Sequence, residues 1–326
     1  MVSVRRAVVV LGWLAVLAAT VGVGVHYLDT TVTVLVVLAS FAPLLMVCAA
    51  VGLLALAATR QWVGTVVAVL VLGVAAWTQL PLYVGDAPPE QGSALTVMQA
   101  NIFFGNSDVE GVVAQVRSKQ VDILTVDELT PGAVPRLGAA GLDEVLPYRY
   151  LRPTELGGGT GIWSRHPLSA QTEHMGFVMN MLSARVDPPG RPPFVVVAAH
   201  PLPPVPRQQT DIWAREMAQV RDILQGLRGG GEPVIVGADF NSTYDHAQFR
   251  ALLGDGFRDA AEQSGAGALR TYPADRWWPP VLAIDHVLVA GGTATSAGIV
   301  ELPGSDHRGV VATVAVPAAG GYPGPG

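Results

Sequence analysis

The chain has 326 residues, of which 50% are hydrophobic and 14% are charged, and its formal net charge is −6. This composition is too apolar for an ordinary soluble protein. Its single cysteine, Cys48, excludes an intramolecular disulfide. The sequence has no basic run, which argues against non-specific binding of nucleic acid through a basic surface stripe.

The apolar excess lies at the N-terminal end, where residues 7–84 contain one acid, Asp29, and one base, Arg60. Crossing a hydrocarbon core of about 30 Å takes roughly 20 helical residues. Apolar stretches of sufficient length cover about residues 7–25, 32–58 and 62–84. A cleaved signal peptide would show one short apolar run instead. We therefore predict a membrane anchor over residues 1–84 with three transmembrane helices, in preference to a buried helical hairpin of a soluble fold.

The arginines of this region predict its orientation. Arg5 and Arg6 precede the first apolar stretch and Arg60 lies between the second and third, whereas the loop 26–31 has no Lys or Arg. The positive-inside rule then keeps the N-terminus and Arg60 cytoplasmic. Three spans would place everything after about Gly85 outside, so we expect a multi-pass protein of the cell membrane with an extracytoplasmic domain. That domain keeps 17 of the 20 basic and 25 of the 26 acidic residues, which is a net charge of −8.

Strand-like and helical patterns alternate after a Pro/Gly-rich linker at 85–92. Short apolar, β-branched runs predict buried strands at 95–100, 121–126, 194–199, 234–236, 281–288 and 310–316. Amphipathic periodicity predicts helices at 108–119, 208–227 and 247–253. The alternation predicts one α/β domain over 93–317 with sheets sandwiched between helices. The Gly/Pro-rich tail at 318–326 is predicted to be disordered.

Polar side chains suited to chemistry follow most of the predicted strands: Asn101, Glu128, His200, Asp239 with Asn241, Asp285, and Asp306 with His307. If these strand ends converge, they collect oxygen ligands for a hard cation and imidazoles that handle phosphate and protons. Asp239 and Asn241 alone could simply cap the following helix. The repetition of the pattern favours a metal-dependent hydrolase of phosphate esters.

The motifs also resemble, in their order, those of the endonuclease/exonuclease/phosphatase superfamily, whose fold is related to pancreatic deoxyribonuclease. The motifs are Met98–Asn101, Val126–Glu128, Gly159–Arg165, Ala199–His200, Gly237–Asn241, Ile284–His286 and Gly304–His307. The segment Asn101–Asn106 is similar to the start of bacterial membrane-anchored members. The resemblance covers about residues 93–317. It implies a four-layer α/β sandwich, with two mixed sheets flanked by helices, and a divalent-metal-dependent phosphoester hydrolase.

The resemblance implies a metal site of Glu128, Asn101 and Asp306. Glu128 would be the main ligand of Mg²⁺ or Mn²⁺, because hard cations prefer carboxylate and amide oxygens. The chain departs from the family at Asp127, where a Gln usually precedes the metal-binding Glu. A carboxylate beside the metal would either strengthen cation binding or repel a phosphate.

The resemblance also implies the catalytic groups. Asp239 would orient and deprotonate the attacking water, and Asn241 would hold water or phosphate. His307 would contact a non-bridging phosphate oxygen, with Asp285 fixing and charging its imidazole. His200 would bind the phosphate or assist the leaving group.

Several other side chains are predicted to have no part in the chemistry. We expect His166, His174 and His246 to be solvated surface residues, and His286 to have a structural role. The pair Trp277–Trp278 is either core or an apolar lip near the substrate or membrane.

The expected substrate is a lipid-linked or cell-envelope phosphoester, because the site would lie near the bilayer and basic residues are scarce. One alternative is an extracytoplasmic nuclease, since acidic nucleases exist. Another is a non-catalytic ligand-binding membrane protein with the same fold. The presence of Glu128, Asp239 and His307 argues against this last alternative.

Overall fold

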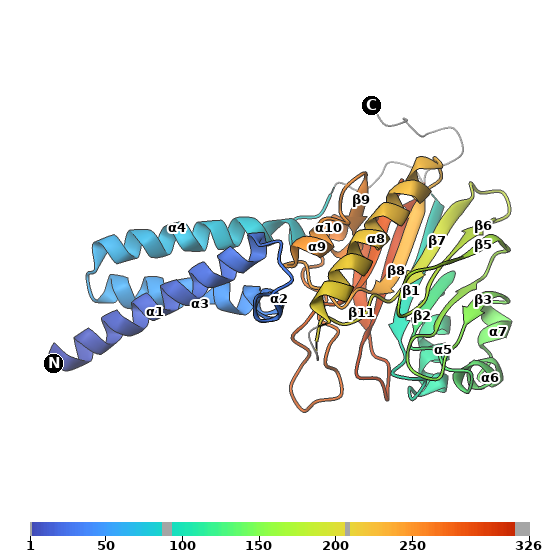
Figure 1. The fold of residues 1–326 in the computed structure, drawn as a ribbon, viewed down its shortest axis with the longest axis horizontal. Helices are drawn as coiled ribbons and strands as arrows, with labels where there is room; N and C mark the ends of the chain where they lie inside the picture. The colour runs from blue at the N-terminus through green and yellow to red at the C-terminus, as the bar shows by residue number, and fades with distance from the viewer. Residues whose placement is uncertain (1, 87–92, 206–208, 317–326) are drawn as a thin grey trace.

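A computed structural model describes residues 2–86, 93–205 and 209–316. The predicted linker, apart from Gly85 and Asp86, and the predicted tail lie outside the described residues. A helical bundle projects from one side of a two-sheet sandwich and meets it beside the short helices α9 and α10 (Figure 1).

The bundle contains α1 (Val2–Tyr27), α2 (Thr33–Ser40), α3 (Ala42–Ala58), α4 (Trp62–Gln79) and the 3₁₀ turn η1 (Leu80–Leu82). Within the described residues, α1 and α4 are each long and apolar enough to cross a membrane. The pair α2 and α3 passes the same test together, but it is bent by 66°. The candidate spans therefore number two, or three if the bent pair is one span.

The predicted stretch 32–58 is thus not one straight helix. The break lies at Phe41, two residues before Pro43, which occupies the first turn of α3. Proline has no N–H to donate and its ring clashes with the carbonyl four residues earlier, so it favours the start of a helix and not its interior. Helices α1 and α3 approach closely: a Cβ on Gly22 would lie 2.9 Å from the carbonyl oxygen of Ala42.

Two mixed sheets form the sandwich. The first has the order β11 (Thr293–Val300), β12 (Gly309–Val316), β1 (Ser93–Asn101), β2 (Ile123–Asp127), β4 (Thr160–Ser164), β3 (Tyr148–Arg152). The second has the order β5 (Leu168–His174), β6 (Met181–Val186), β7 (Phe194–Ala199), β8 (Val234–Asp239), β10 (Asp285–Ala290), β9 (Phe257–Asp259). Strand β1 is parallel to β2 and β7 is parallel to β8, whereas the other pairs are antiparallel. The predicted pair of mixed sheets is confirmed.

Alternate strand residues face the two sides of each sheet. Val97 of β1 and Val196 of β7 share the core between the sheets, whereas Met98 packs under α5 (Val109–Ser118) and Val197 packs under α8 (Thr210–Gly229). The remaining helices are short: α6 (Ala133–Ala139), α7 (Leu142–Val145), α9 (Ala247–Arg250) and α10 (Ala260–Ser264). Both sheets are therefore flanked by helices, as predicted.

Two predicted elements differ in extent. The predicted helix 247–253 ends at Arg250, and the predicted strand 281–288 begins only at Asp285. The residues before Asp285 instead form a bridge between Leu282 and Tyr272. This pairing draws the chain away from β8 and into the wall of the site described below.

Polar contacts join the bundle to the sandwich. Asp245 lies at their junction, where its Oδ1 is 2.8 Å from Nδ1 of His26 and accepts a 2.9 Å hydrogen bond from Gln79. Arg250 donates to the carbonyl oxygen of His26. Because His26 and Asp245 are almost fully buried, these contacts fix how the bundle meets the domain.

His246 also belongs to this junction, and its prediction as a surface residue is wrong. Its side chain is only 2% exposed. Its Nδ1 accepts a hydrogen bond from the Thr243 amide at 3.0 Å, and its Nε2 donates to the carbonyl oxygen of Val36 in α2 at 3.0 Å. Burial lowers the pKa of His246 to about 4, so the imidazole is neutral. The sequence around His246 is polar, and only the docking of α2 buries it.

Candidate active site

The predicted site residues gather at one edge of the sandwich, where β1, β2, β7 and β8 end and β10 begins. Strand pairing sets Asn101 opposite Asp127, and Asp239 opposite Asp285. The loop before β12 brings in Asp306 and His307, and it is tied to β1 by a 2.8 Å hydrogen bond from Ser305 to the carbonyl oxygen of Asn101. Tertiary structure thus collects side chains from six segments of the chain.

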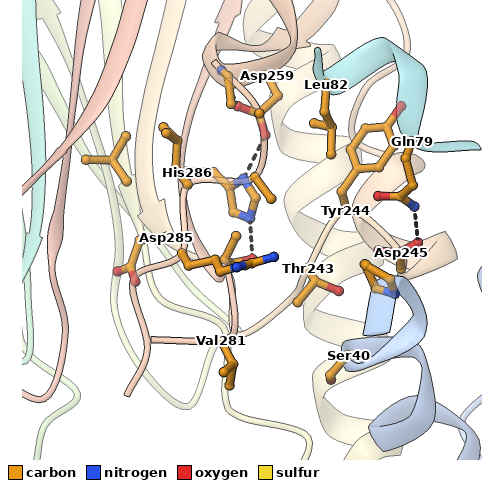
Figure 2. A pocket seen from close by; sticks show the side chains of 18 of the residues that line it. Ser40, Gln79, Leu82, Thr243, Tyr244, Asp245, Asp259, Val281, Asp285 and His286 are labelled. Atoms are coloured by element: carbon orange, nitrogen blue, oxygen red, sulfur yellow. Dashed lines mark hydrogen bonds and ion pairs between the residues drawn. The ribbon is translucent and has the colours of Figure 1, made fainter. Parts of the chain in front are cut away.

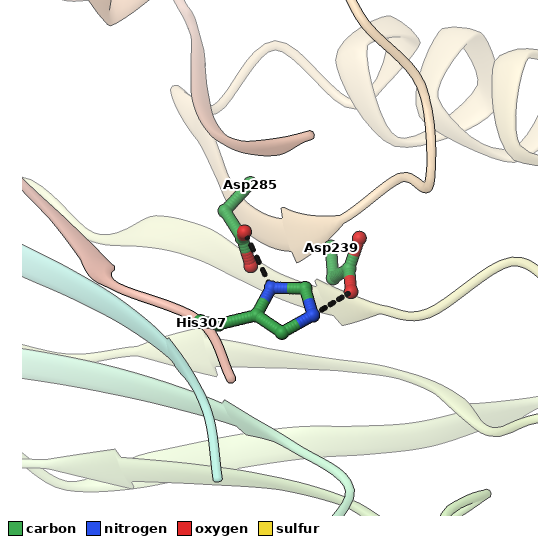
Figure 3. Close-up of side chains that lie close together, drawn as sticks. All are labelled: Asp239, Asp285 and His307. Atoms are coloured by element: carbon green, nitrogen blue, oxygen red, sulfur yellow. Dashed lines mark hydrogen bonds and ion pairs between the residues drawn. The ribbon is translucent and has the colours of Figure 1, made fainter. Parts of the chain in front are cut away.

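The imidazole of His307 lies between two carboxylates (Figure 3). Its Nδ1 is 2.8 Å from Oδ2 of Asp285, and its Nε2 is 3.7 Å from Oδ2 of Asp239. Burial by itself would lower the pKa of His307, but the charges of Asp285 and Asp239 outweigh it and raise the pKa to about 10. His307 is therefore an imidazolium at neutral pH. Burial likewise works to raise the pKa of Asp285, yet His307 outweighs it and the pKa is lowered.

Asp239 is held by donors on both carboxylate oxygens. Its Oδ1 accepts from the Asn241 amide at 2.9 Å, and its Oδ2 accepts from Nδ2 of Asn101 at 3.1 Å. Nε2 of His200 lies 3.6 Å from the same Oδ2. Burial and the charge of Asp285 raise the pKa of Asp239, while His307 and His200 act in the opposite direction. A fixed carboxylate with a raised pKa is suited to accept a proton.

Glu128, Asn101 and Asp306 form the oxygen-rich part of the site. Glu128 adopts φ 57°, in the left-handed region that favours glycine, and such strain of about 1–3 kcal/mol is found mostly at functional sites. Its Oε1 accepts from Asn101 at 3.2 Å and its Oε2 accepts from the Phe104 amide at 2.8 Å. Burial raises the pKa of Asp306 to about 6, and its buried Oδ1 has no hydrogen-bond partner among the described residues. An orphaned carboxylate oxygen beside Glu128 fits a hard cation.

A second cluster of side chains also lies close enough together to hold a metal ion. Asp239, Asp285 and His307 offer atoms that all lie within 4.8 Å of one another. A metal ligand must be deprotonated, whereas the raised pKa of His307 keeps both its ring nitrogens protonated. The imidazolium already supplies the positive charge between the two carboxylates, so we favour the Glu128 group as the metal site.

Asp127 does not point toward that group. It is fully buried between the sheets, where its Oδ2 accepts from the Asp239 amide at 3.0 Å and from Gln99 at 3.2 Å. Burial raises its pKa to about 7. Asp127 therefore does not act on the cation or the phosphate, which was the expectation from the sequence. Instead it links the ends of β2 and β8 and so holds the backbone of Asp239 in place.

His200 and Asn241 line the same pocket as Asp239. The Nδ1 of His200 is buried without a partner among the described residues, so the ring is held through its packing and Asp239. Asn241 has φ 50° and donates from Nδ2 to the carbonyl oxygen of Pro201 at 3.0 Å. This bond anchors the loop after β7, which includes the stiff Pro203–Pro204 segment of the pocket wall.

The pocket has a volume of about 320 Å³ and includes residues that sequence reasoning missed. Tyr272 packs against His307, with ring centroids 4.9 Å apart and the ring planes tilted by 45°. Leu282 and Ile284 add apolar wall, and Ser40 reaches the pocket from the end of α2. The bend after Ser40 could be suspected from Pro43, but no sequence signal places Ser40 beside residues about 200 positions later.

Comparisons with known proteins bear on the family and the fold. A family model described as Endonuclease/Exonuclease/phosphatase family matches residues 98–307, which include all the predicted site residues. A humanised D. rerio TDP2 structure with 14 mutations has a TM-score of 0.56 at 19% identity, and the match covers 68% of this chain and 98% of that chain.

Two bacterial structures are also similar. The mannosyl-6-phosphatase Bt3783 of Bacteroides thetaiotaomicron has a TM-score of 0.53 at 16% identity, covering 68% of this chain and 99% of that one. An endonuclease/exonuclease/phosphatase from Beutenbergia cavernae has a TM-score of 0.56 at 20% identity, covering 69% and 72%. The TM-scores show a common fold, and at these low identities the likeness extends no further than the fold. A comparison with curated proteins gave no match.

Proposed function

The chain belongs to the endonuclease/exonuclease/phosphatase family of phosphoester hydrolases, and we propose that it is a membrane-anchored, divalent-metal-dependent phosphodiesterase or phosphatase. The observation that carries this proposal is the charged Asp285–His307 pair beside Asp239, in a pocket that also borders the apolar bundle at Ser40. We propose a lipid-linked or cell-envelope phosphoester as its substrate.

In this proposal Asp239 activates the attacking water. Hydrogen bonds from Asn101 and Asn241 orient its carboxylate, and burial raises its pKa, which makes it a better proton acceptor than an ordinary carboxylate. Asp127 supports the backbone of Asp239 from the interior. General-base assistance of this kind contributes about 10²- to 10⁴-fold in rate.

His307 then stabilises charge on the phosphate. Its Nδ1 is engaged by Asp285, whereas its Nε2 lies 3.7 Å from Asp239, beyond a normal hydrogen bond. That N–H remains available to a non-bridging phosphate oxygen. A fixed charged donor in a buried site costs no reorganisation when charge develops in the transition state. His200, whose Nε2 lies 3.6 Å from the same Asp239 oxygen, would bind the phosphate or assist the leaving group.

Glu128, Asn101 and Asp306 would hold Mg²⁺ or Mn²⁺. When bound, the cation would neutralise charge on the phosphate and leaving oxygen as a Lewis acid. The orphaned oxygen of Asp306 and the strained backbone of Glu128 support this assignment.

The bundle supports the membrane part of the proposal. We propose that α1, the bent pair α2–α3 and α4 form three spans, and that Arg5, Arg6 and Arg60 keep their ends cytoplasmic. The catalytic domain, within residues 93–317, would then lie on the extracytoplasmic side.

The purified full-length chain in detergent should test the proposal against a panel of phosphoesters, with Mg²⁺ and with excess chelator. Hydrolysis should require the metal, and Glu128→Gln should abolish it while the fold survives. Glu110→Gln, on the exposed surface of α5, is the matched control and should keep full activity. Failure of metal to stimulate any hydrolysis would contradict the proposal, and a clear preference for single-stranded nucleic acid would favour the nuclease alternative.

A further inference from the structure

A narrow cavity lies where the bundle meets the catalytic domain (Figure 2). We call it the junction cavity. Leu44 of α3, Leu82 of η1 and Tyr83 line it on the bundle side, and Leu269 and Val281 line it on the domain side. Its volume is about 60 Å³, several times the roughly 10–15 Å³ that one water needs by the same measure. The catalytic pocket, at about 320 Å³, is much wider.

The junction cavity and the catalytic pocket share a wall. The wall is the ribbon formed by residues 270–272 and 281–284, which are joined by the Tyr272–Leu282 bridge. Alternate residues of 281–284 face opposite sides: Leu282 and Ile284 line the catalytic pocket, whereas Val281 and Ala283 line the junction cavity. On the other side of the ribbon, Tyr272 lines the catalytic pocket and Arg270 lines the junction cavity. Ser40 lines both. The two spaces are therefore adjacent at Ser40, and a ligand that occupied both would pass beside this side chain.

Two of the three acidic groups in the cavity wall, Asp245 and Asp259, have partners inside that wall, whereas Asp285 is bound through Oδ2 to His307 and its buried Oδ1 has no partner among the described residues. Asp245 is bound to His26 and Gln79, and Asp259 lies 2.7 Å from Nδ1 of His286 (Figure 2). Polar groups that already have hydrogen-bond partners gain little from a new polar ligand. The remaining volume of the junction cavity is therefore suited to an apolar ligand. The lining is mainly apolar.

The cavity also lies at the level where a bilayer would change from hydrocarbon to headgroups. Tyr27, Trp77 and Tyr83 are each more than half exposed at the domain end of the bundle, and exposed aromatic residues of this kind mark membrane interfaces. Tyr83 additionally lines the cavity. Leu44, half exposed on α3, continues its apolar wall onto the outer surface of the bundle.

We propose that the junction cavity binds the hydrocarbon chain of a lipid phosphoester whose phosphate occupies the catalytic pocket. This inference rests on the proposed function and adds a chain-binding site to it. The junction cavity offers about 60 Å³ and the catalytic pocket about 320 Å³, so the larger space suits the phosphate headgroup and the smaller one suits the chain. The bend between α2 and α3 is part of the site, because it brings Ser40 to the passage between the two spaces.

The test uses alkyl p-nitrophenyl phosphodiesters with methyl, butyl, octyl and dodecyl groups, the full-length chain, Mg²⁺ and a constant detergent concentration. Each methylene that enters the cavity should raise kcat/KM about fourfold, the equivalent of about 0.8 kcal/mol. The rise should stop when the cavity is full. Ala268→Trp, or the milder Ala268→Leu, places bulk in the cavity wall and should flatten the dependence on chain length, while hydrolysis of the methyl ester is unchanged.

Ala76→Trp, on the exposed face of α4, is the matched control and should keep the wild-type dependence on chain length. A wild-type protein that hydrolyses the methyl ester but gains nothing from longer chains would overturn the inference and leave the proposed function standing. Equal losses on all four esters in both Ala268 variants would also overturn it. Failure of the wild type to hydrolyse any of the four diesters with Mg²⁺ would overturn this inference, and the proposed function would be rejected with it only if phosphomonoesters are not hydrolysed either.

Discussion

Replacing Asp285 by Asn removes the charge that faces His307 and keeps the shape of the side chain. The wild-type contact joins Oδ2 of Asp285 to Nδ1 of His307 at 2.8 Å, and both side chains are almost fully buried. Burial disfavours the imidazolium, but Asp285 provides the largest opposing influence, ahead of Asp239, and the pKa of His307 rises from 6.5 to about 10. At 1.36 kcal/mol per unit, this rise is a net preference of roughly 5 kcal/mol for the charged form.

Without Asp285, the pKa of His307 should fall to or below the neutral range, because burial then faces only the weaker influences of Asp239 and Asp306. A histidine with a raised pKa keeps its charge below that pKa and loses it as pH rises through it. The wild type should therefore keep the charged contact throughout the neutral range, whereas Asp285→Asn should lose it as pH rises. Loss of an oriented transition-state contact costs about 10²- to 10³-fold in rate, or roughly 3–4 kcal/mol.

The assay is kcat on a soluble phosphodiester with saturating Mg²⁺, from about pH 5 to about pH 8. The deficit of Asp285→Asn should be largest at the alkaline end and should shrink toward the acid end. Asp259→Asn is a matched control, because Asp259 makes the same kind of buried contact with His286 outside the catalytic pocket, and its pH profile should match that of the wild type.

The double variant Asp285→Asn/His307→Ala tests whether the two residues act as a unit. It should be little worse than His307→Ala alone, because Asp285 acts through the imidazole. Independent, multiplicative losses, or a deficit in Asp285→Asn that does not change with pH, would refute this reasoning.

Other outcomes are expected. A periplasm-active reporter fused after Gly326 should be active, and activity only from a cytoplasm-active reporter would reverse the proposed orientation. Asp239→Asn should lower kcat at least about a hundredfold, while His166→Ala, outside the pocket, should change it less than about twofold. The pKa of His246 is about 4 in the folded protein and 6.5 in the unfolded chain. Between about pH 4 and pH 6.5 the unfolded state therefore binds more protons than the folded state. Stability should fall by roughly 3 kcal/mol from about pH 6.5 to about pH 4; thermal unfolding of the full chain should show this, and His246→Gln should flatten the dependence.

The pattern of the amino-acid sequence was sufficient to predict the alternation of strands and helices and the polar residues that end the strands, whereas the two mixed sheets were implied only by the resemblance to a known family. These features depend on the local sequence. The spacing of apolar residues indicates which face of a helix or strand is buried, and a polar residue after a β-branched run marks where the strand leaves the core. Helix α5 lies within one residue of its predicted bounds for this reason. The apolar N-terminal stretches were equally visible, because hydropathy and length are properties of the segment alone.

Tertiary structure alone decided which elements meet. Asp127 accepts from the Asp239 amide, 112 positions later, and His246 bonds to Val36, 210 positions earlier. No local pattern encodes such a partner, so one residue was expected beside the metal and the other in solvent. The position of Ser40 between the catalytic pocket and the junction cavity has the same origin. Periodicity specifies the side of an element that must be covered, whereas the packing of distant elements specifies what covers it.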